Sequence, residues 1–479
     1  MKKNYVKFII FFILICGFLY SLNSIFRFKY EDGIYDMDIF YELPENSVDV
    51  LVLGSSHAFM DINPAVFWNE YGFSTYVLGG SVQPMWNTYY YLKEALKTQS
   101  PKVIILEGFR TAEQGDFLGD SNAIKNTYGL KLSKNKIEAL QLSVPHDRLW
   151  EVGLSYIQYH NRYEDLEASD FLPYLGNENY YKYWKGYMNG FVTVAFDVPD
   201  VSKVLDSMPL TPKTEKYYRK IIELAQENQI PIIVAISPYY AITPEDQARF
   251  NQAGEIAAEY GVPFINFNNM YQELNLDFSR DCADVSHLNH YGGEKITSYL
   301  GKYIKENYDV PIHRGDVGYQ SWDKNVEYYE QQKRNVMLKE ILDMEKYLEF
   351  LSENDQFTYI ISLDGEYHDW TKKVDITEIL NRYGINDDYN SLFVRIHNTT
   401  AFQKPVLKDY CYFFDLMNDT VAVSGKMVNE VVIDSVIWNR QELPKNVVNG
   451  VNLFVFNEYT GSYVERVGFN AEDGYTILR

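Results

Sequence analysis

Three side chains of this sequence have the types and neighbours that nucleophilic catalysis requires. Ser56 follows an apolar run and a glycine, Gly54. Asp284 and His287 stand in the stretch Asp-Val-Ser-His, with two residues between them. A serine hydroxyl becomes a good nucleophile when a base takes its proton and a third group fixes the tautomer of that base. We therefore expect Ser56 to attack, His287 to act as the base and Asp284 to orient the imidazole.

Each half of this set has an ordinary structural explanation when it is taken alone. A Gly-Ser turn before a helix is common N-cap chemistry, and an Asp followed by a His describes many surface loops. The two halves together are harder to explain by accident, because both would reach the same edge of a sheet.

Next to the nucleophile, His57 is expected to be a cap or a surface residue. His290 is expected to begin the last helix of the domain.

Short apolar runs alternate with amphipathic segments between residues 48 and 303, and these elements have to position the three side chains. Strands are expected at residues 48–53, 75–78, 102–106, 230–236 and 263–266, and helices at 86–96, 214–228 and 244–260. Strands that alternate with helices indicate a parallel sheet covered on both faces. The expected fold is therefore α/β, with a doubly wound, flavodoxin-like sheet in three layers. Ligands bind at the carboxyl edge of such sheets.

The segments that carry these residues resemble the sequence blocks of the SGNH/GDSL hydrolase superfamily, over residues 48–305. The stretch Leu-Val-Leu-Gly-Ser-Ser-His looks like the first block, in which the nucleophile is Ser56 and not Ser55. The stretch from Asp284 to His287 looks like the last block, which supplies acid and base. Gly79 stands where the glycine of the second block donates an N–H group. The resemblance thus implies an oxyanion hole that includes the N–H groups of Ser56 and Gly79.

One block departs from the family pattern. The family usually has a Gly-x-Asn-Asp turn after the third strand, whose asparagine completes the oxyanion hole, but here the strand is followed by Glu107-Gly-Phe-Arg110. We expect Gln83 to supply the third donor, with Asn87 and Arg110 as alternatives. A site without that asparagine is more like the branch that contains the D-alanine transfer proteins of teichoic acids and the alginate O-acetylation proteins. Those relatives imply an extracytoplasmic polymer as substrate and a membrane-bound O-acyltransferase as partner.

The N-terminus indicates where the protein works. Lys2, Lys3 and Lys7 precede an uncharged run over residues 8–26 that ends at Arg27. That run has about the ~20 residues that a bilayer-spanning helix needs. Flanking lysines favour a cytoplasmic N-terminus, and no small-x-small cleavage site follows the run. We expect an uncleaved signal anchor at residues 1–30, a single-pass cell-membrane protein and an extracytoplasmic catalytic domain.

The rest of the chain divides into further regions. The hydrolase-like domain is expected at residues 31–315, with an aromatic-rich helical insertion at 111–212 beside the active site. Residues 316–354 are expected to be a helical linker, with one long helix at 323–354. Residues 355–479 are expected to form a mainly β accessory domain, with strands at 359–363, 421–423, 430–437 and 451–456. A hairpin formed by residues 450–469 faintly resembles the interleukin-like EMT inducer modules, which would imply glycan binding. A purely structural β domain is the alternative.

Composition excludes several functions. The chain has 44 basic and 66 acidic residues, and its net charge of −22 opposes binding to nucleic acid. Its three cysteines do not predict a disulfide framework. No grouping of His, Cys, Asp and Glu has the spacing of metal ligands, and no glycine-rich phosphate loop occurs, so we expect no metal and no other cofactor.

Two classes of function fit these observations. The first is a serine acyl-ester enzyme that acts on an acylated or acyl-accepting cell-surface glycan. It is an esterase if water accepts the acyl group and an O-acyltransferase if a sugar hydroxyl does, and the sequence leaves this choice open. The second is a catalytically inactive scaffold with an SGNH-like fold that binds glycan. The enzyme requires Ser56 Oγ to lie within about 3 Å of a ring nitrogen of His287, with Asp284 on the other nitrogen.

Overall fold

The computed structural model consists of two compact units, Met1–Glu327 and Tyr328–Arg479. It describes residues 2–27, 32–154, 159–166, 168–171, 182–364, 382, 391–396, 399–405, 410–416, 419–425, 435–438, 441–443, 448–471 and 473–479. The helices and short helical turns of the first unit are α1 (Lys2–Phe26), α2 (Tyr35–Phe40), α3 (Ser56–Asp61), α4 (Pro64–Val66), η1 (Phe67–Tyr71), α5 (Met85–Ala95), η2 (Phe109–Ala112), α6 (Asp120–Lys125), α7 (Lys134–Ser143), η3 (His146–Arg148), α8 (Leu149–Gly153), η4 (His160–Glu164), α10 (Ala168–Phe171), α12 (Pro212–Glu227), α13 (Pro244–Glu259), η6 (Phe267–Asn269) and α14 (His290–Asn307). The division falls within α15 (Gln320–Glu340).

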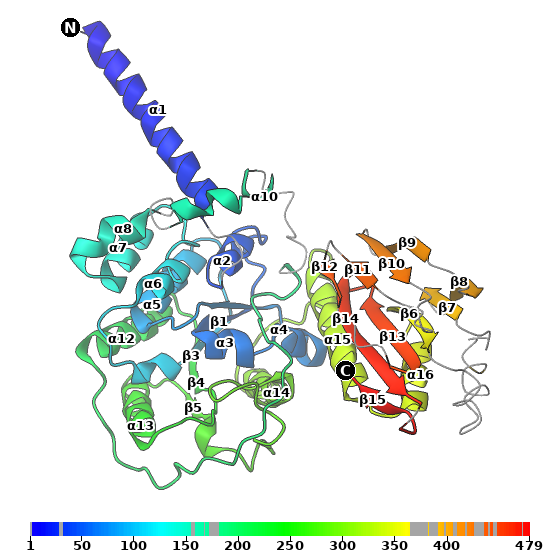
Figure 1. The fold of residues 1–479 in the computed structure, drawn as a ribbon. Helices are drawn as coiled ribbons and strands as arrows, with labels where there is room; N and C mark the ends of the chain where they lie inside the picture. The colour runs from blue at the N-terminus through cyan, green and yellow to red at the C-terminus, as the bar shows by residue number, and fades with distance from the viewer. Residues whose placement is uncertain are drawn as a thin grey trace. The chain divides into compact units, whose positions relative to one another are not determined.

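A parallel sheet of five strands forms the centre of the first unit (Figure 1). Its strands are β1 (Val50–Gly54), β2 (Thr75–Gly79), β3 (Val103–Glu107), β4 (Ile232–Ile236) and β5 (Phe264–Asn266). They stand in the order β2-β1-β3-β4-β5, and every pairing is parallel. This is the flavodoxin-like order, in which the strand order reverses between β1 and β3. The expected α/β fold with a doubly wound sheet is confirmed.

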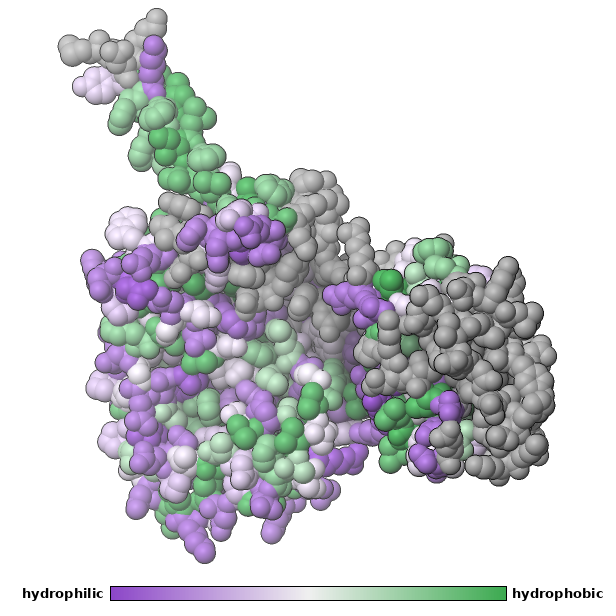
Figure 2. All heavy atoms as spheres, in the orientation of Figure 1, coloured by the Kyte–Doolittle hydropathy of each residue, from purple (hydrophilic) through white to green (hydrophobic). Residues whose placement is uncertain are grey.

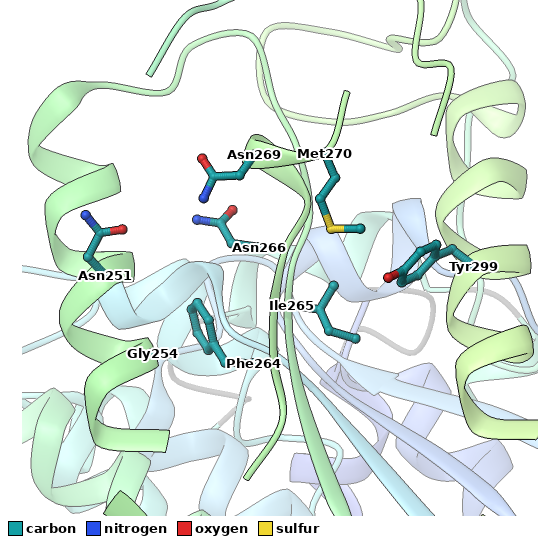
Figure 3. A pocket seen from close by; sticks show the side chains of 8 residues that line it. All are labelled: Asn251, Gly254, Phe264, Ile265, Asn266, Asn269, Met270 and Tyr299. Atoms are coloured by element: carbon teal, nitrogen blue, oxygen red, sulfur yellow. The ribbon is translucent and has the colours of Figure 1, made fainter. Parts of the chain in front are cut away.

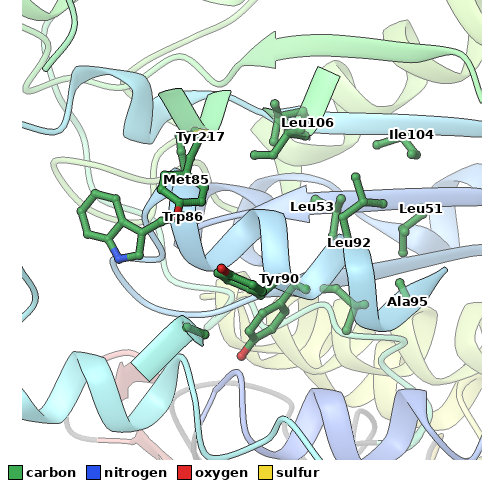
Figure 4. Close-up of a cluster of buried hydrophobic side chains, with 14 of the residues drawn as sticks. Leu51, Leu53, Met85, Trp86, Tyr90, Leu92, Ala95, Ile104, Leu106 and Tyr217 are labelled. Atoms are coloured by element: carbon green, nitrogen blue, oxygen red, sulfur yellow. The ribbon is translucent and has the colours of Figure 1, made fainter. Parts of the chain in front are cut away.

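Alternate residues of each strand serve the two faces of the sheet, as the two-residue period of a strand requires. On one face, Leu51 and Leu53 share a core with Ile104 and with helices α5 and α12 (Figure 4). On the other face, Val50 and Val52 share a core with α3 and α14. The strands are therefore buried on both sides, which explains their continuously apolar sequences.

Two of the covering helices begin with strong local start sequences. Thr211 accepts a hydrogen bond from the N–H of Thr214, with proline in the first turn of α12. Thr243 and Asp246 form a reciprocal capping box at the start of α13, again with proline in the first turn. Side chains that satisfy the free N–H groups of a first turn fix where a helix begins. These caps explain why both helices begin close to the residues expected from the sequence.

The long insertion is made of two parts with different positions. Its helices α6, α7 and α8 lie on the α5 side of the domain, and α7 packs against α5 (Figure 1). Its later, non-helical part runs past the loop that carries His287, where the N–H of Val194 donates to Cys282 O at 2.9 Å. We expected the insertion to form a helical cap beside the active site. The helices α6, α7 and α8 instead lie on the α5 side, and it is the non-helical part of the insertion that passes the His287 loop.

Gly186 closes the edge of the sheet at β2 and has no room for a side chain. The N–H of Val77 donates to Lys185 O at 2.9 Å, so this segment covers the edge strand. Gly186 has φ +82°, and a Cβ atom built on it would lie 1.9 Å from Val77 O. A residue with a side chain would have to move the backbone of β2 or of its own segment.

We expect Gly186→Ala to lower the free energy of unfolding of the first unit by on the order of 2–4 kcal/mol, because it adds a backbone clash to an unfavourable φ. Urea denaturation followed by circular dichroism measures this loss. Gly119→Ala is the matched control, because Gly119 is exposed and a Cβ there meets nothing within 4 Å. Equal midpoints for the two variants would contradict the expectation.

Helix α1 carries no charged residue after Lys7, and most of its length stands free of the domain (Figure 2). Its stretch Tyr5–Phe26 has a mean hydropathy of 2.3, and none of its most apolar window is buried within the structure. It is therefore long and apolar enough to cross a membrane. It contacts the folded domain at η4 and α10.

The helical segment that we expected at 323–354 is broken. The structure has α15 (Gln320–Glu340) and α16 (Met344–Glu353) in place of one long helix. Asp343 ends the continuity, because its carboxylate accepts the N–H of Lys346 at 3.0 Å and so caps a new helix. Met344, Tyr347 and other apolar residues of α16 pack into the core of the second unit. Residues that we expected in a linker thus belong to that unit's core.

The second unit is mainly β, as expected. One antiparallel sheet has the order β15-β14-β13-β6-β7-β8 and another the order β12-β11-β10-β9. The strands are β6 (Phe357–Asp364), β7 (Ser391–Ile396), β8 (Thr399–Pro405), β9 (Tyr410–Leu416), β10 (Asp419–Gly425), β11 (Ser435–Trp438), β12 (Gln441–Glu442), β13 (Gly450–Asn457), β14 (Ser462–Asn470) and β15 (Thr476–Leu478). Strands β13 and β14 form the expected hairpin. Part of the strand expected at 430–437 lies outside the described residues.

Candidate active site

Ser56 stands at the carboxyl edge of the sheet, at the point where the strand order reverses. Strand β1 ends at Gly54, Ser55 remains extended and Ser56 is the first residue of α3. A Cβ atom on Gly54 would lie 2.7 Å from the Cβ of Glu107 at the end of β3, so only glycine allows the two strand ends to approach so closely. Ser56 itself is half-buried.

The loop from Asp284 to His287 is folded around the aspartate side chain. Asp284 Oδ1 accepts the N–H groups of Ser286 at 2.7 Å and of His287 at 2.9 Å. The loop is closed by the N–H of Ala283, which donates to the carbonyl of His287 at 2.9 Å. These bonds fix the carboxylate within hydrogen-bond distance of the imidazole ring that it has to orient.

The structure brings the three expected side chains into one hydrogen-bonded series. His287 Nε2 lies 2.8 Å from Ser56 Oγ. His287 Nδ1 lies 2.9 Å from Asp284 Oδ2 and 3.0 Å from Oδ1. With Nδ1–H donating to the carboxylate, the Nε2 lone pair faces the serine hydroxyl. That is the tautomer in which an imidazole can remove the proton of a nucleophile.

Asp284 is held in its charged form. Burial by itself would raise the pKa of this carboxyl group, but the hydrogen bond from the His287 ring and the N–H of Ser286 outweigh burial, and its pKa lies below the usual value. The side chain is 48% exposed, so water also stabilises the charge. An ionised carboxylate is the form that can accept from Nδ1–H and stabilise an imidazolium.

A second polar layer, which the sequence analysis did not identify, lies beneath the first. His57 is buried, and its ring stacks on Phe109 with a centroid distance of 3.9 Å and lies 4.8 Å from the ring of His287. Its Nδ1 is 3.2 Å from Asp61 Oδ2, while Asp61 Oδ1 accepts the N–H of Leu288 at 3.0 Å. The expectation that His57 is a cap or surface residue is wrong. Asp61 instead connects the helix of the nucleophile to the residue that follows His287.

Burial shifts the pKa values of this layer toward neutral side chains. It lowers the pKa of His57 to about 4 and raises the pKa of Asp61 to about 8. Near neutral pH the two groups are therefore a hydrogen-bonded neutral pair and not an ion pair. A neutral pair beneath His287 adds no fixed charge to the site when the catalytic imidazole gains or loses a proton.

Glu107 occupies the position after the third strand where the family pattern differs. It is fully buried, its Oε1 accepts the N–H of Phe109 at 2.8 Å, and Ser55 Oγ donates to Oε2 at 3.4 Å. Burial raises the pKa of Glu107 to about 7. This side chain is thus directed beneath the turn that carries the nucleophile. Glu107 therefore supports the turn of the nucleophile. The end of β3 then offers no side-chain amide in the place of the family's asparagine.

The expected oxyanion donors lie in different surroundings. Gly79 pairs with Gly54 across the parallel strands, and a Cβ atom on it would lie 3.1 Å from Ser55 O, so it stands beside the nucleophile. Gln83 is buried, and its amide nitrogen donates to Thr88 Oγ1 at 3.2 Å, which directs one of its N–H groups to α5. The roles of Ser56, Gly79 and Gln83 in an oxyanion hole stay predictions.

The two alternative donors have other contacts. Asn87 Oδ1 accepts from Ser143 Oγ at 2.9 Å. Arg110 forms an ion pair with Glu113, and burial lowers the pKa of its guanidinium to about 10. Arg110 is thus engaged by a neighbour, whereas the bond of Asn87 uses its oxygen and leaves its buried amide nitrogen, the possible donor, without a partner among the described residues. Gln83, Asn87 and Arg110 were considered for the third donor. Each of them has at least one hydrogen-bonding or ion-pairing partner.

Two hollows lie away from the catalytic residues, at the β5 edge of the sheet. One, of about 470 Å³, is lined by β5, α13, α14 and the turn after β5, and includes Asn266, Met270 and Tyr299 (Figure 3). The other, of about 500 Å³, is lined by residues near Val201 and Tyr271. The triad residues line neither hollow. Within the described residues, no group of three or more His, Cys, Asp and Glu side chains is arranged to hold a metal ion.

Three solved structures are similar to this chain at low identity. A putative lipolytic protein of the G-D-S-L family from Desulfitobacterium hafniense DCB-2 is 12% identical, with a TM-score of 0.28, over 54% of this chain and 99% of that chain. A putative acylhydrolase from Bacteroides fragilis NCTC 9343 is 12% identical, with a TM-score of 0.28, over 56% and 92%. A GDSL-like lipase from Bacteroides thetaiotaomicron VPI-5482 is 13% identical, with a TM-score of 0.26, over 54% and 87%.

No protein-family model matches the sequence, and no curated protein matches it. Identities of 12–13% assign no reaction to this chain. Its chemistry has to be deduced from the side chains of its own site.

Proposed function

We propose that this chain is a membrane-anchored serine enzyme that transfers acyl groups through an ester on Ser56. The observation that carries the proposal is the series of hydrogen bonds from Ser56 Oγ through His287 to Asp284, with heavy-atom distances of 2.8 and 2.9 Å. A nucleophile, a base and a group that orients the base are the parts that covalent acyl transfer requires. Their position at the carboxyl edge of the sheet is where substrates bind in such folds.

The reaction begins when Ser56 Oγ attacks the carbonyl carbon of an acyl ester. An Oγ–C bond forms, the hydroxyl proton moves to His287 Nε2, and the carbonyl oxygen becomes an oxyanion. The N–H groups of Ser56 and Gly79 are proposed to receive that oxyanion, with Gln83 as the third donor. As the oxyanion collapses, the C–O bond to the alcohol breaks and the alcohol takes the proton from Nε2. The acyl-serine then reacts with water or with a sugar hydroxyl by the same steps.

The geometry argues against an inactive scaffold. A site without catalysis gives no physical reason for Ser56 and His287 to be held at hydrogen-bond distance while two N–H groups of the loop bind Asp284. Such an arrangement restricts three side chains and costs conformational entropy. The scaffold that binds glycan without reacting is therefore the weaker alternative.

The N-terminal helix and the resemblance of the sequence blocks support a proposed location and substrate class. The apolar stretch Tyr5–Phe26 has the length of a membrane span, and lysines precede it. We propose that α1 anchors the chain with the catalytic domain outside the cytoplasm. The proposed acceptor or donor is an acylated cell-surface or exported polysaccharide. The proposed partner, a membrane-bound O-acyltransferase, would deliver the acyl group.

A fluorophosphonate probe tests the proposed nucleophile directly. Such probes phosphonylate only serines that an adjacent base activates, and the full-length protein in detergent is expected to carry one probe on the peptide that contains Ser56. Mass spectrometry of the digested protein distinguishes Ser56 from Ser55. Acetyl transfer from p-nitrophenyl acetate gives the corresponding acyl adduct. Absence of both adducts would refute the enzyme and favour the scaffold.

Asp61 is expected to act as a positioning residue for the catalytic histidine. Asp61→Ala leaves the N–H of Leu288 and Nδ1 of His57 without their partner, and both lie in the buried layer beneath His287. A displaced base lowers the rate more than substrate binding, so kcat should fall by roughly 10- to 100-fold with little change in KM. Asp61→Asn keeps an oxygen for Leu288 and should recover most of the activity.

Steady-state kinetics with p-nitrophenyl acetate measure this effect, and circular dichroism verifies that the variants fold. Asp323→Ala is a suitable control, because Asp323 accepts a hydrogen bond from Trp68 in another part of the unit. A folded Asp61→Ala variant with unchanged kcat would show that Asp61 has no positioning role.

A further inference from the structure

Two arginines fix the end of α1 to the folded domain. Arg162 donates to the carbonyl oxygens of Phe26 at 2.9 Å and Arg27 at 3.2 Å, and it also pairs with Asp170 at 3.1 Å. Arg27 donates to Tyr128 O at 3.1 Å. These bonds therefore lie at the surface of the domain, at the point where the apolar stretch of α1 ends. If α1 spans a bilayer, this surface lies at the level of the headgroups.

Exposed aromatic side chains stand on the segments that contact or adjoin this point. Tyr163, which follows Arg162, is 65% exposed, and Phe171, which follows Asp170, is 56% exposed. Tyr128 connects the same point to α8, because its hydroxyl donates to Val152 O at 2.5 Å. In α8, Trp150 is 79% exposed. Exposed apolar side chains that gather on one surface mark sites of contact with a protein or a membrane.

We propose that Trp150, Tyr163 and Phe171 form a second membrane contact, which inserts into the interface of the bilayer that α1 spans. The inference rests on the proposed membrane anchoring of the chain. Aromatic rings prefer the headgroup level, where an apolar body and a polar edge are both accommodated. The occupant is lipid and not a protein, because the apolar helix that spans the bilayer ends at this same surface.

The charges near these rings indicate which lipids the surface accepts. Arg162 is paired with Asp170, and Arg148 is paired with Asp120 at 2.5 Å and Glu151 at 2.7 Å. These two cations are thus neutralised on the protein and have little attraction left for anionic headgroups. The contact therefore depends on the aromatic rings and should form equally well on zwitterionic lipid.

A contact beside the anchor limits the motion of the catalytic domain. A domain that is held only at the end of α1 tilts together with that helix in the bilayer, whereas a second insertion point fixes its tilt. The helices α6, α7, α8 and α10 of the insertion thereby gain a function that is separate from the active site. They hold the sheet edge that carries Ser56 at a constant orientation to the membrane surface.

Fluorescence of single labelled positions tests this contact in the full-length chain. The chain is reconstituted in phosphatidylcholine nanodiscs, in a background in which Cys16 and Cys411 are replaced by serine and the buried Cys282 is kept. An environment-sensitive NBD label is placed at Trp150→Cys, at Phe171→Cys or, as the matched control, at Leu205→Cys. Leu205 is 85% exposed and follows Val204, whose carbonyl oxygen accepts from Asn251 of α13. Helix α13 lies far from α1 (Figure 1).

Labels at positions 150 and 171 are expected to shift to the blue and to lose emission when the discs contain doxyl-labelled lipid, whereas the label at 205 should do neither. Discs with anionic lipid should give the same result. Three labels that all behave as in water, in a chain that resists carbonate extraction, would overturn the second contact while the anchor stands. Release of the chain by carbonate would refute the anchor as well. A blue shift without lipid quenching would assign the surface to a protein partner and overturn the proposal.

Labelling of Ser56 by the fluorophosphonate probe is measured on the same preparations. It reports the proposed chemistry independently of the membrane contact. A preparation that reacts with the probe but shows no lipid quenching therefore separates failure of this inference from failure of the proposed function.

Discussion

Ser56→Ala is expected to lower the rate of acyl-enzyme formation by on the order of 10⁴-fold or more and to abolish labelling by the fluorophosphonate probe. The hydroxyl of Ser56 is the atom that forms the covalent bond, and it lies 2.8 Å from the nitrogen that receives its proton. Alanine removes the nucleophile and leaves the base intact. Any activity that remains would come from water in the same site.

His287→Ala should cost nearly as much, and the double variant should cost hardly more than either single variant. Residues that act as one unit in catalysis are not additive, because removal of one part already disables the others. Pre-steady-state release of nitrophenol measures both variants. Ser279→Ala is the control, since Ser279 is exposed and its hydroxyl donates to Asp277. Additive losses, or an acyl adduct on another serine in Ser56→Ala, would contradict the assigned nucleophile.

The sheet was predictable from sequence because its strands are buried on both faces. A doubly buried strand has to be apolar at every residue, and runs such as Val-Ile-Ile-Leu before Glu107 are typical of such strands. All five expected strands are present within one or two residues of the observed bounds. The meeting of Ser56 with His287 also followed from the sequence, since both come after strands of one parallel sheet, whose carboxyl ends share an edge.

The buried layer beneath the triad was not predictable by the same reasoning. His57 and Asp61 are four residues apart on α3, a spacing that places them on one helix face, and this was the available indication. A histidine beside a nucleophile at the start of a helix is nevertheless usually exposed. It is buried here because Phe109 and Tyr239 contact its ring, and these residues come from other segments of the chain.

The break between α15 and α16 was missed for a related reason. The apolar spacing continues across the break, so periodicity alone predicts one helix. The decisive residue is Asp343, whose side chain caps the second helix. Aspartate is tolerated inside helices and favoured at caps, and only the packing of Met344 and Tyr347 against the second unit's β strands decides between the two.

Asp284→Asn is expected to lower kcat by on the order of 10³–10⁴-fold while the loop keeps its shape. Asp284 uses its two oxygens differently. Oδ1 binds the N–H groups of Ser286 and His287 and also lies 3.0 Å from His287 Nδ1, whereas Oδ2 faces Nδ1 at 2.9 Å. Asparagine can keep the first set of bonds through its single oxygen. Its NH₂ group then has to face Nδ1.

That exchange inverts the hydrogen-bonding roles of the imidazole. An NH₂ group beside Nδ1 favours the tautomer in which Nδ1 accepts and the ring proton lies on Nε2, which then donates to Ser56 Oγ and cannot take its proton. The variant should bind the substrate with nearly unchanged KM, because no group that touches the acyl ester is lost. The loss should therefore appear in kcat, and steady-state kinetics over a range of substrate concentrations measure it.

Asp277→Asn provides a closely matched control. Asp277 Oδ1 likewise accepts the N–H of a residue two positions ahead, Ser279, at 3.0 Å, but no imidazole lies on its other oxygen. The Asp277→Asn variant should retain the wild-type kcat, because the same substitution in a similar turn changes the tautomer of no catalytic histidine. If Asp284→Asn also kept kcat, the imidazole would obtain its orientation from another group. The neutral pair of His57 and Asp61 beneath it would then be the first candidate.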